Sequence, residues 1–486
     1  MPKALEVYRK RIDHIGNDYY LGHIFRTLRW WTDPTHVSVL GDLVGSQWID
    51  DAEFEERGER FWKRVFRGGE RVEDGLAVQS SSDNEGGKGN IHVLGEDEAG
   101  WKSRIINIAG NHDIGYAGDL SPERMVRFER VFGKANYELR FALPSSSSIS
   151  SPNSTFYPQS STPAVDDSFK PIPELRIIVL NDMNLDSPAS SSSLQDSTYN
   201  FLNNVITTSH PVARPALFTL LLTHIPLYKP SGICVDGPLF NFFEHFQYNN
   251  GIREQNHLSL DASRGILEGL FGMSGNPDAD GHGKGRNGVI LTGHDHEGCD
   301  VYHYINQSIP GPLAPEWEVV KTVHSQNLTT RSKETEIIPG LREITLRSMM
   351  GDFDGNAGLL SLWFDEEKWE WEMGFQNCEM GSQHGWWIVH VLDLITVVVM
   401  IVYSGLYLAF KEGVIRNGKQ EVGKGEVNGV MGSGNENGKV VMNGNGNGSV
   451  KGLKKKKSRK ALNGHAVNGN GNGNNGTKLN GMISEE

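Results

Sequence analysis

Short runs of apolar and β-branched residues recur along the chain, and each ends in a polar cluster. Five of these runs are HVSVLGD, RIINIAGNHD, LRIIVLND, ALFTLLLTHIP and GVILTGHDH, with helical stretches between them. Buried strands whose carboxyl ends deliver polar side chains to a shared edge produce this pattern. The sequence therefore predicts a layered α/β body, closed by antiparallel strands within residues 340–375.

One apolar stretch is long enough to cross a bilayer. Residues 386–410, WWIVHVLDLITVVVMIVYSGLYLAF, contain a single acid, Asp393, and carry aromatic rings toward both ends. This length and composition predict a transmembrane helix, because a buried core helix rarely runs so far without polar interruption. Lys411 and Arg416 follow it, so the positive-inside rule places the tail in the cytoplasm and residues 1–385 on the lumenal or external side.

Three other segments have compositions that cannot build a core. Residues 411–486 are dominated by Asn and Gly and include the basic run KKKKSRK, which predicts a disordered tail. Stretches near 76–100 and 145–170 are rich in Ser, Gly, Asp and Asn, which predicts surface insertions. We therefore expect one globular domain over residues 1–380, followed by the membrane helix and the tail.

Charge and cysteine content narrow the choice of partners and compartment. The net charge is −13 and basic residues concentrate in the tail, so the acidic body is unsuited to wrapping nucleic acid.

The chain has three cysteines, at Cys234, Cys299 and Cys378. This number excludes a disulfide framework and leaves room for one bridge at most. Sequons at Asn153, Asn306 and Asn327 are compatible with a lumenal glycoprotein.

Four of the predicted strand ends finish in residues of the kinds that bind metal ions. They are Asp42 in GD, Asn111, His112 and Asp113 in GNHD, His224 in THIP, and His294 and His296 in GHDH. Hard and borderline divalent ions bind carboxylate and amide oxygens together with imidazole nitrogens, and this set offers all three. A lone GD or a lone histidine carries little information, but the ordered series after successive strands is specific.

This series resembles the calcineurin-like metallophosphoesterases, whose pattern is DxH, GD, GNH(D/E), a lone His and GHxH. The resemblance implies a sandwich of two mixed β-sheets flanked by helices. It also implies two divalent ions, with Mn²⁺ the expected metal, bridged by Asp42. Asn111, His224 and His294 would hold one ion, and His296 would help to hold the other.

The same resemblance assigns roles to the remaining two residues of GNHD. His112 would face the phosphate and either protonate the leaving oxygen or stabilise its charge, and Asp113 would orient it. Two cations that clamp a phosphoryl group and activate water make a covalent nucleophile unnecessary.

The sequence around the motifs resembles a narrower group, the fungal ethanolamine-phosphate phosphodiesterases that remodel GPI anchors in the endoplasmic reticulum. The similar stretches are LGHIFRTLRWWTDPTHVSVLGDLVGSQWID, NDMNLDSPA, GHDHEGCDVYHYI and RSMMGDFDGNAGLLSLW, all within residues 18–410. This resemblance implies a manganese-dependent enzyme of the endoplasmic reticulum membrane, with its catalytic domain in the lumen. It would remove ethanolamine phosphate from a mannose of the GPI glycan, with GPI-anchored proteins and membrane lipid as partners.

The chain departs from the family pattern at its start. The family's first block, Asp-x-His or Asp-x-Gln on an initial strand, has no counterpart here, and the pair Asp13-His14 has the wrong spacing. One ion would then keep only Asp42 and His296. Two explanations stay open: a natural form that begins further upstream, which the intact remaining blocks favour, or a protein that binds GPI-anchored cargo without cleaving it.

Other enzymes of the same superfamily share the metal pattern. A phosphoserine/threonine phosphatase fits the motifs, but such enzymes are typically soluble, which the membrane helix and the sequons disfavour. A nucleotide or sphingolipid phosphodiesterase also stays open. Only the sequence flanking the motifs separates these alternatives.

Overall fold

The computed structural model describes residues 3–77, 91–144, 170–234, 239–244, 251–305, 317–322 and 340–424. The three sequons, the basic run of the tail and most of the two predicted insertions lie outside these residues. The chain divides into one compact unit, Met1–Tyr403, and a second unit, Ser404–Glu486. All sheets and the site described below belong to the first unit.

An eight-stranded sheet forms the centre of this unit, with strand order β12-β11-β13-β10-β7-β6-β5-β3. Its strands are β3 (Ile91–Val93), β5 (Tyr137–Ala142), β6 (Glu174–Val179), β7 (Leu217–Leu222), β10 (Gly288–Thr292), β11 (Cys299–Ile305), β12 (Trp317–Lys321) and β13 (Gly340–Thr345). The four central strands β6, β7, β10 and β13 are parallel, whereas β5 and β11 run antiparallel to their central neighbours. Every residue of β6 and β7 is buried, as expected for strands covered on both faces.

The remaining strands form three smaller assemblies. They are a sheet of β1 (Val37–Val39), β4 (Arg104–Asn107) and β2 (Glu70–Arg71), a ribbon of β14 (Asn356–Asp365) and β15 (Glu370–Glu379), and a hairpin of β8 (Phe240–Phe242) and β9 (Ile252–Gln255). The sequence-based expectation of two mixed sheets is therefore only partly met, because the sheet of β1, β4 and β2 is entirely parallel. Within the described residues β1 and β14 each pair on one side only.

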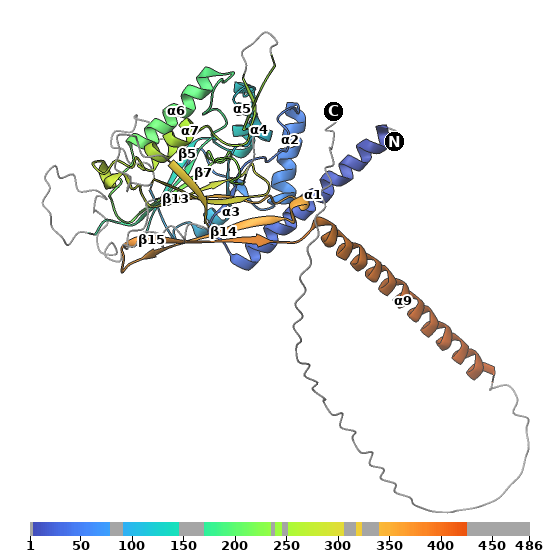
Figure 1. Ribbon diagram of the computed structural model, residues 1–486. Helices are drawn as coiled ribbons and strands as arrows, with labels where there is room; N and C mark the ends of the chain where they lie inside the picture. Colours follow the sequence, from blue (N-terminus) through green and yellow to red (C-terminus); the bar gives the residue numbers. More distant parts are fainter. Residues whose placement is uncertain are drawn as a thin grey trace, which may run out of the picture. The chain divides into compact units, whose positions relative to one another are not determined.

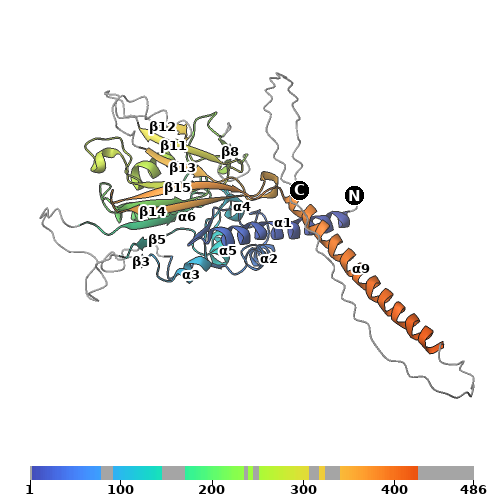
Figure 2. The ribbon, with the colours of Figure 1, turned by 90° about the horizontal axis from the view of Figure 1, so that it is seen from below.

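Helices complete a layered arrangement. They are α1 (Lys3–Thr32), α2 (Asp51–Arg60), α3 (Glu98–Ser103), α4 (Asn111–Ile114), α5 (Pro122–Phe132), α6 (Ser192–Thr207), α7 (Leu260–Arg264) and α9 (Gln383–Lys424), with short π or 3₁₀ turns at Phe61–Val65, Gly265–Leu270, Asp280–Gly283 and Gly351–Phe353. Helix α6 covers one face of the eight-stranded sheet and the β14–β15 ribbon lies toward the other (Figures 1 and 2). Helices α1, α2 and α5 contribute buried side chains to the same hydrophobic cluster as β4. The predicted layered α/β body is confirmed.

The segment 91–100 is more ordered than a surface insertion. Ile91–Val93 pairs in parallel with β5 as an edge strand, and the following helix buries Trp101, which is 4% exposed. The rings of His92 and Phe141 pack against this tryptophan. Residues 91–100 are half-buried or exposed, and the short apolar run among them finds a strand partner that local composition does not reveal.

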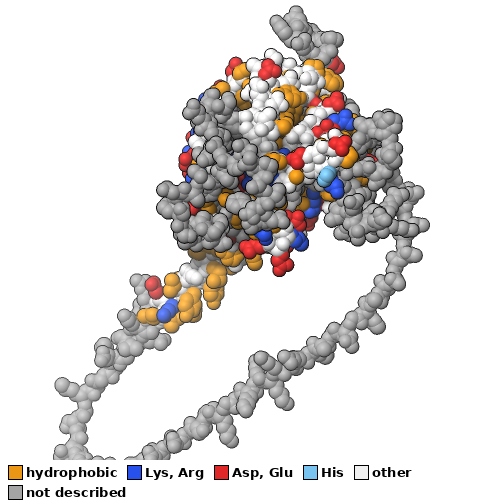
Figure 3. Space-filling view, turned by 90° about the vertical axis from the view of Figure 1, so that its left-hand side faces the viewer, with side chains coloured by type: hydrophobic (Ala, Val, Ile, Leu, Met, Phe, Trp, Pro, Cys, Tyr) orange, Lys and Arg blue, Asp and Glu red, His pale blue; other side chains and the backbone are white. Residues whose placement is uncertain are grey.

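Helix α9 contains the predicted membrane span. An 18-residue stretch within Gln383–Ile415 has a mean hydropathy of 2.2 and is not buried, and Figure 3 shows apolar side chains uncovered along the helix. Among the described residues this is the one helix long and apolar enough to cross a membrane. The helix continues to Lys424, beyond residue 411, where the sequence predicts the start of the tail. The Lys, Glu and Gln residues that follow the apolar span are good helix formers.

Candidate metal centre

Four strands from two sheets bring their carboxyl ends to one place. Asp42 follows β1, Asn111 follows β4, His224 follows β7 and His294 follows β10. Asp42, His224 and His294 each offer a ligand atom, and these atoms lie within 4.8 Å of one another. The convergence arises because parallel strands deliver the residues after their carboxyl ends to the same edge.

Asn111 completes this group. Its Oδ1 lies 3.0 Å from Nε2 of His224 and 3.0 Å from Nδ1 of His294. The Oδ2 of Asp42 lies 3.5 Å from the same Nε2 of His224. A carboxylate oxygen, an amide oxygen and two imidazole nitrogens are a donor set that suits a borderline divalent cation, so these four residues fit one metal position.

Main-chain carbonyls orient both imidazole rings. Nδ1 of His224 lies 2.5 Å from the carbonyl oxygen of Leu40, and Nε2 of His294 lies 2.9 Å from that of Gln255. Each ring therefore has one nitrogen fixed by the backbone and the other turned toward the group, as is usual for metal-binding histidines. Sequence reasoning missed Leu40 and Gln255 because a main-chain acceptor leaves no signature in the residue type.

The charges in the group are strongly coupled. Burial alone would lower the pKa of His224, but the Asp42 carboxylate raises it to about 9. Burial lowers the pKa of His294 to about 3, and the charge of His224 acts in the same direction. The site thus favours one positive charge beside Asp42 and a neutral imidazole at His294, and a cation satisfies both preferences.

Two of these residues adopt strained backbone conformations. The φ angles of Asp42 and His294 are 59° and 67°, a left-handed region that costs a non-glycine residue about 1–3 kcal/mol. Close packing also explains glycines in the motifs. A Cβ at Gly41 would lie 2.1 Å from Nδ1 of His224, and one at Gly110 would lie 2.3 Å from the Asp42 backbone nitrogen. The GD and GNHD motifs therefore bring the backbone itself close to the ligands.

The two predicted catalytic residues occupy different settings. The backbone N–H of His112 donates to Oδ1 of Asp42 at 2.9 Å, and the His112 side chain is half-buried. Asp113 is fully buried and accepts from the backbone N–H groups of Val44 and Gly110 at 3.0 and 2.9 Å. Burial raises the pKa of Asp113 to about 7, and the charge of Asp42 adds to this effect. These contacts hold the GNHD turn against the GD loop, so orienting His112 stays a prediction for Asp113.

The remaining predicted ligand, His296, stands apart from the group of three. Its ring meets the ring of Phe353 with 5.0 Å between centroids. It shares with Asp42, His224 and His294 the lining of a cavity of about 770 Å³. The cavity extends between β1 and β14 and is otherwise lined mainly by apolar side chains of both sheets and of α1. A second cation beside Asp42 would therefore find His296 in the wall of the same cavity.

One residue not chosen from the sequence supports the His224 loop. Asp182 is fully buried and its Oδ2 accepts from the backbone N–H of Ile225 at 2.9 Å. Burial raises the pKa of this carboxyl to about 7. The sequence does contain a signal for Asp182, because the run LRIIVLND is one of the predicted strands that end in a polar cluster.

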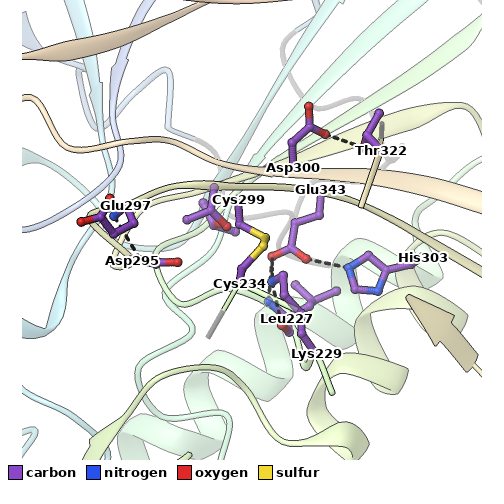
Figure 4. The surroundings of a disulfide bond; sticks show 12 residues. Leu227, Lys229, Cys234, Asp295, Glu297, Cys299, Asp300, His303, Thr322 and Glu343 are labelled. Atoms are coloured by element: carbon purple, nitrogen blue, oxygen red, sulfur yellow. Dashed lines mark hydrogen bonds and ion pairs between the residues drawn. A yellow bond between two sulfur atoms is a disulfide. The ribbon is translucent and has the colours of Figure 1, made fainter. Parts of the chain in front are cut away.

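A disulfide links the loops that carry the histidines. It joins Cys234, which follows the His224 loop, to Cys299, which begins β11 directly after GHDH. Figure 4 shows a buried polar cluster close to the bridge. There the carboxylate of Glu343 accepts from the Lys229 ammonium at 3.0 Å and from the Leu227 backbone N–H at 2.9 Å. The bridge and this cluster together fasten the segment that follows His224.

Known proteins similar to this chain agree with the chemistry of the group. Protein TED1 of Saccharomyces cerevisiae is 33% identical over 429 residues, a match that covers 80% of this chain and 77% of that protein. The chain belongs to the TED1 family. Metallophosphoesterase 1 of Danio rerio is 24% identical over 307 residues, with 62% of each chain covered. The relatives named Metallophosphoesterase 1 indicate a metallophosphoesterase relationship and imply use of divalent metal.

Three further comparisons with known proteins give weaker information about the family of this chain. Cell division control protein 1 of Saccharomyces cerevisiae is 24% identical over 288 residues, covering 59% of this chain and 42% of that protein. No protein-family model matches the chain. Among solved structures, GAP50, the anchor in the inner membrane complex of Plasmodium, aligns with a TM-score of 0.27 at 10% identity, covering 68% of this chain and 66% of that chain. A similarity at that level does not bear on the fold.

Proposed function

We propose that this chain is a membrane-anchored, metal-dependent phosphodiesterase that removes ethanolamine phosphate from a mannose of GPI anchors in the endoplasmic reticulum. The observation that carries the phosphodiesterase proposal is the convergence of Asp42, Asn111, His224 and His294 on one point. The substrate is inferred from the flanking sequences, which resemble the GPI-remodelling enzymes. The relatives named Metallophosphoesterase 1 support the phosphoesterase part of the proposal.

Each residue of the site has a proposed task. Two bound divalent ions, for which we expect Mn²⁺, would supply Lewis-acid polarisation of the phosphoryl group and activation of water. Asp42 would bridge the two positions, with Asn111, His224 and His294 on one side and His296 on the other. The half-buried His112 would face the substrate and hold or deliver a proton at the leaving oxygen.

The orientation in the membrane is part of the proposal. The Cys234–Cys299 disulfide suits an oxidising compartment, because cytosolic thiols are kept reduced. Lys411 and Arg416 lie on the C-terminal side of the apolar span, where cytoplasmic residues carry positive charge. We therefore propose that the catalytic body lies in the lumen and the tail in the cytoplasm.

A second candidate function is recognition of GPI-anchored cargo without cleavage. It is favoured by the uneven metal site, because the second position has only Asp42 and His296 among the predicted ligands. A two-ligand position binds a cation weakly, and a site with one occupied position could hold a phosphate without hydrolysing it.

The test is manganese-stimulated hydrolysis of a chromogenic phosphodiester by the full chain in detergent or lipid. Asp42→Ala and His294→Ala should abolish turnover, whereas Asp196→Ala, an exposed aspartate on α6, should leave it unchanged. Thermal melting of each variant shows whether the fold is retained. Near wild-type turnover in either ligand variant would exclude the two-metal mechanism.

A comparison with an upstream extension separates the two candidates. The extended chain carries the family's Asp-x-His or Asp-x-Gln strand ahead of α1. Activity that appears only in the extended chain would favour the enzyme, with the added strand completing the second position. Inactivity of both forms, with a GPI glycan still bound, would favour the recognition protein.

A further inference from the structure

Helix α1 has two apolar faces. Its inner face carries Tyr20, Ile24 and Phe25, which are 1%, 0% and 6% exposed and pack on the rest of the domain. A second apolar set lies on the opposite side, and we refer to Ile12, Ile15, Tyr19 and Trp30 as the outer stripe. These four residues are 69%, 43%, 49% and 78% exposed. A soluble helix that already buries one face has no need of a second apolar face.

Ile12, Ile15 and Tyr19 are separated by three and four residues, so their side chains adjoin along one side of the helix. Trp30 lies on the same side, eleven residues further along. At 1.5 Å per residue the stripe extends for about 27 Å. Arg26 lies on the same side of the helix and is exposed, whereas the exposed acid of this region, Asp13, lies off the stripe. An apolar stripe with a basic residue beside it is the composition of helices that lie in a lipid interface.

The start of the membrane helix rests directly on α1. The ring of Trp386 lies 6.0 Å from that of Tyr20 and 5.4 Å from that of His23, measured between centroids. The amide of Gln383 donates to Oδ1 of Asn17 at 2.7 Å. Tryptophans at the end of a membrane span mark the level of the lipid headgroups. The middle of α1 therefore lies within side-chain contact of the level at which the bilayer begins.

We infer that the outer stripe of α1 is a lipid-binding surface that seats the domain on the same bilayer that α9 crosses. Tyr20, His23 and Asn17 of α1 contact the start of α9. The outer stripe on the same helix therefore lies next to the membrane interface, which favours lipid over a separate protein partner. The inner face of α1 contributes Leu21, Phe25 and Leu28 to the cavity that also contains the metal ligands. One helix therefore stands between the bilayer and the site, which keeps the cavity beside the lipid surface.

The test places a fluorescent reporter on the stripe in the full chain. Cys378→Ser removes the free thiol, and the other two cysteines are paired. Single cysteines replace Ile12, Ile15 or Tyr19 and carry an environment-sensitive dye. The matched control is Leu260→Cys on α7, a residue that is 45% exposed. Proteoliposomes of phosphatidylcholine contain nitroxide lipids labelled either close to the headgroup or at the end of the acyl chain.

The expected result is a blue-shifted emission at all three stripe positions and strong quenching by the headgroup-proximal nitroxide. The deep nitroxide should quench less, since an interfacial helix sinks only about 5–10 Å into the boundary. The Leu260 reporter should stay aqueous. Stripe reporters that are quenched no more than the control would overturn the inference.

A second outcome would also overturn it. Reporters shielded both from nitroxide lipids and from aqueous iodide would show that protein, such as a second copy of the chain, covers the stripe. Ile12→Glu with Ile15→Glu provides a further check in the Tyr19 reporter chain. It should lose lipid quenching at Tyr19 while the melting temperature is unchanged, because both substituted side chains are exposed. These readouts do not depend on hydrolysis, so they stand apart from the proposed function.

Discussion

The two sides of the proposed metal centre differ in how this chain supports the candidate ligands. On one side, Asn111, His224 and His294 each contact another ligand, and backbone carbonyls hold both imidazole rings. On the other side, His296 packs on Phe353 and borders a cavity of about 770 Å³. The cavity is flanked by β1 and β14, each of which has one strand partner within the described residues. The position of each candidate ligand thus depends on the groups that pack against its side chain as much as on the motif that contains it.

The largest loss of stability is expected on removing the buried ion pair between Lys229 and Glu343, which holds the segment after His224. Lys229→Met would leave the Glu343 carboxylate, which is fully buried, without its cation. A buried pair that loses one partner typically costs about 3–5 kcal/mol of unfolding free energy. Denaturant unfolding measures this loss. Lys229→Met with Glu343→Gln removes both charges and should recover part of it, and equal losses in the two variants would contradict the assignment.

The same cluster predicts how stability depends on pH. Burial would raise the pKa of Glu343, but the Lys229 ammonium and the His303 ring hold it at about 2, below the ordinary value of 4.5. A carboxyl with a lowered pKa contributes stability that is fully present above pH 4.5 and is lost as pH falls toward 2. Melting temperatures across this range should fall more steeply in the native chain than in Glu343→Gln. Parallel curves would show that other carboxyls dominate acid unfolding.

The disulfide should have the next largest effect. Cys234→Ser with Cys299→Ser removes the link between the two histidine loops and should cost about 2–4 kcal/mol of unfolding free energy. Manganese affinity should fall as well, because the bridge restrains the segments after His224 and His296. Cys378→Ser is the control and should change neither quantity. Unchanged manganese affinity in the double variant would show that the loops hold their positions without the bridge.

A paired substitution compares the two sides directly. His294→Ala should lower manganese affinity by at least roughly 10–100-fold, the loss that changes behind a ligand already cause. His296→Ala should cost less in this chain, because its metal position is less complete. Titration calorimetry of both variants measures the difference. A larger loss at His296 would reverse the comparison between the two sides.

The smallest effect is expected at Leu362 beside the cavity, and Leu221 in the core is the comparison. Leu221 is fully buried in β7 beneath α6, so Leu221→Ala should cost about 2–5 kcal/mol. Leu362 of β14 is half-buried and lines the cavity, so Leu362→Ala removes fewer contacts and should cost less than about 1 kcal/mol. Thermal melting compares the two. Equal losses would mean that the cavity walls are as tightly packed as the core.

The strand ends could be predicted because two patterns coincide in the sequence. Runs such as ALFTLLL and GVILT are long enough to mark buried strands, and each is followed at once by a residue that can bind metal. Their convergence then follows from strand direction. These two patterns predict that Asp42, Asn111, His224 and His294 meet at a shared edge, and the resemblance to the metallophosphoesterases adds their assignment as metal ligands.

Features that depend on distant partners could not be predicted. Nothing in three cysteines selects the Cys234–Cys299 pairing over the alternatives. The role of Gln255 rests on its carbonyl oxygen, which every residue type carries. The strand at Ile91–Val93 has three residues, and it forms because β5 offers it an edge. In each case the deciding contact is remote in sequence.

The connection between the body and the membrane sets how far the site can travel. Strand β15 ends at Glu379 and α9 begins at Gln383, so residues 380–382 form the whole tether. Even fully extended, such a tether spans only about 10 Å. With α9 in a bilayer, as proposed, the body would be confined to a thin layer above the lipid, and molecules resident in that bilayer would reach it by lateral diffusion at a high effective concentration. A substrate presented far above the membrane would lie beyond its range.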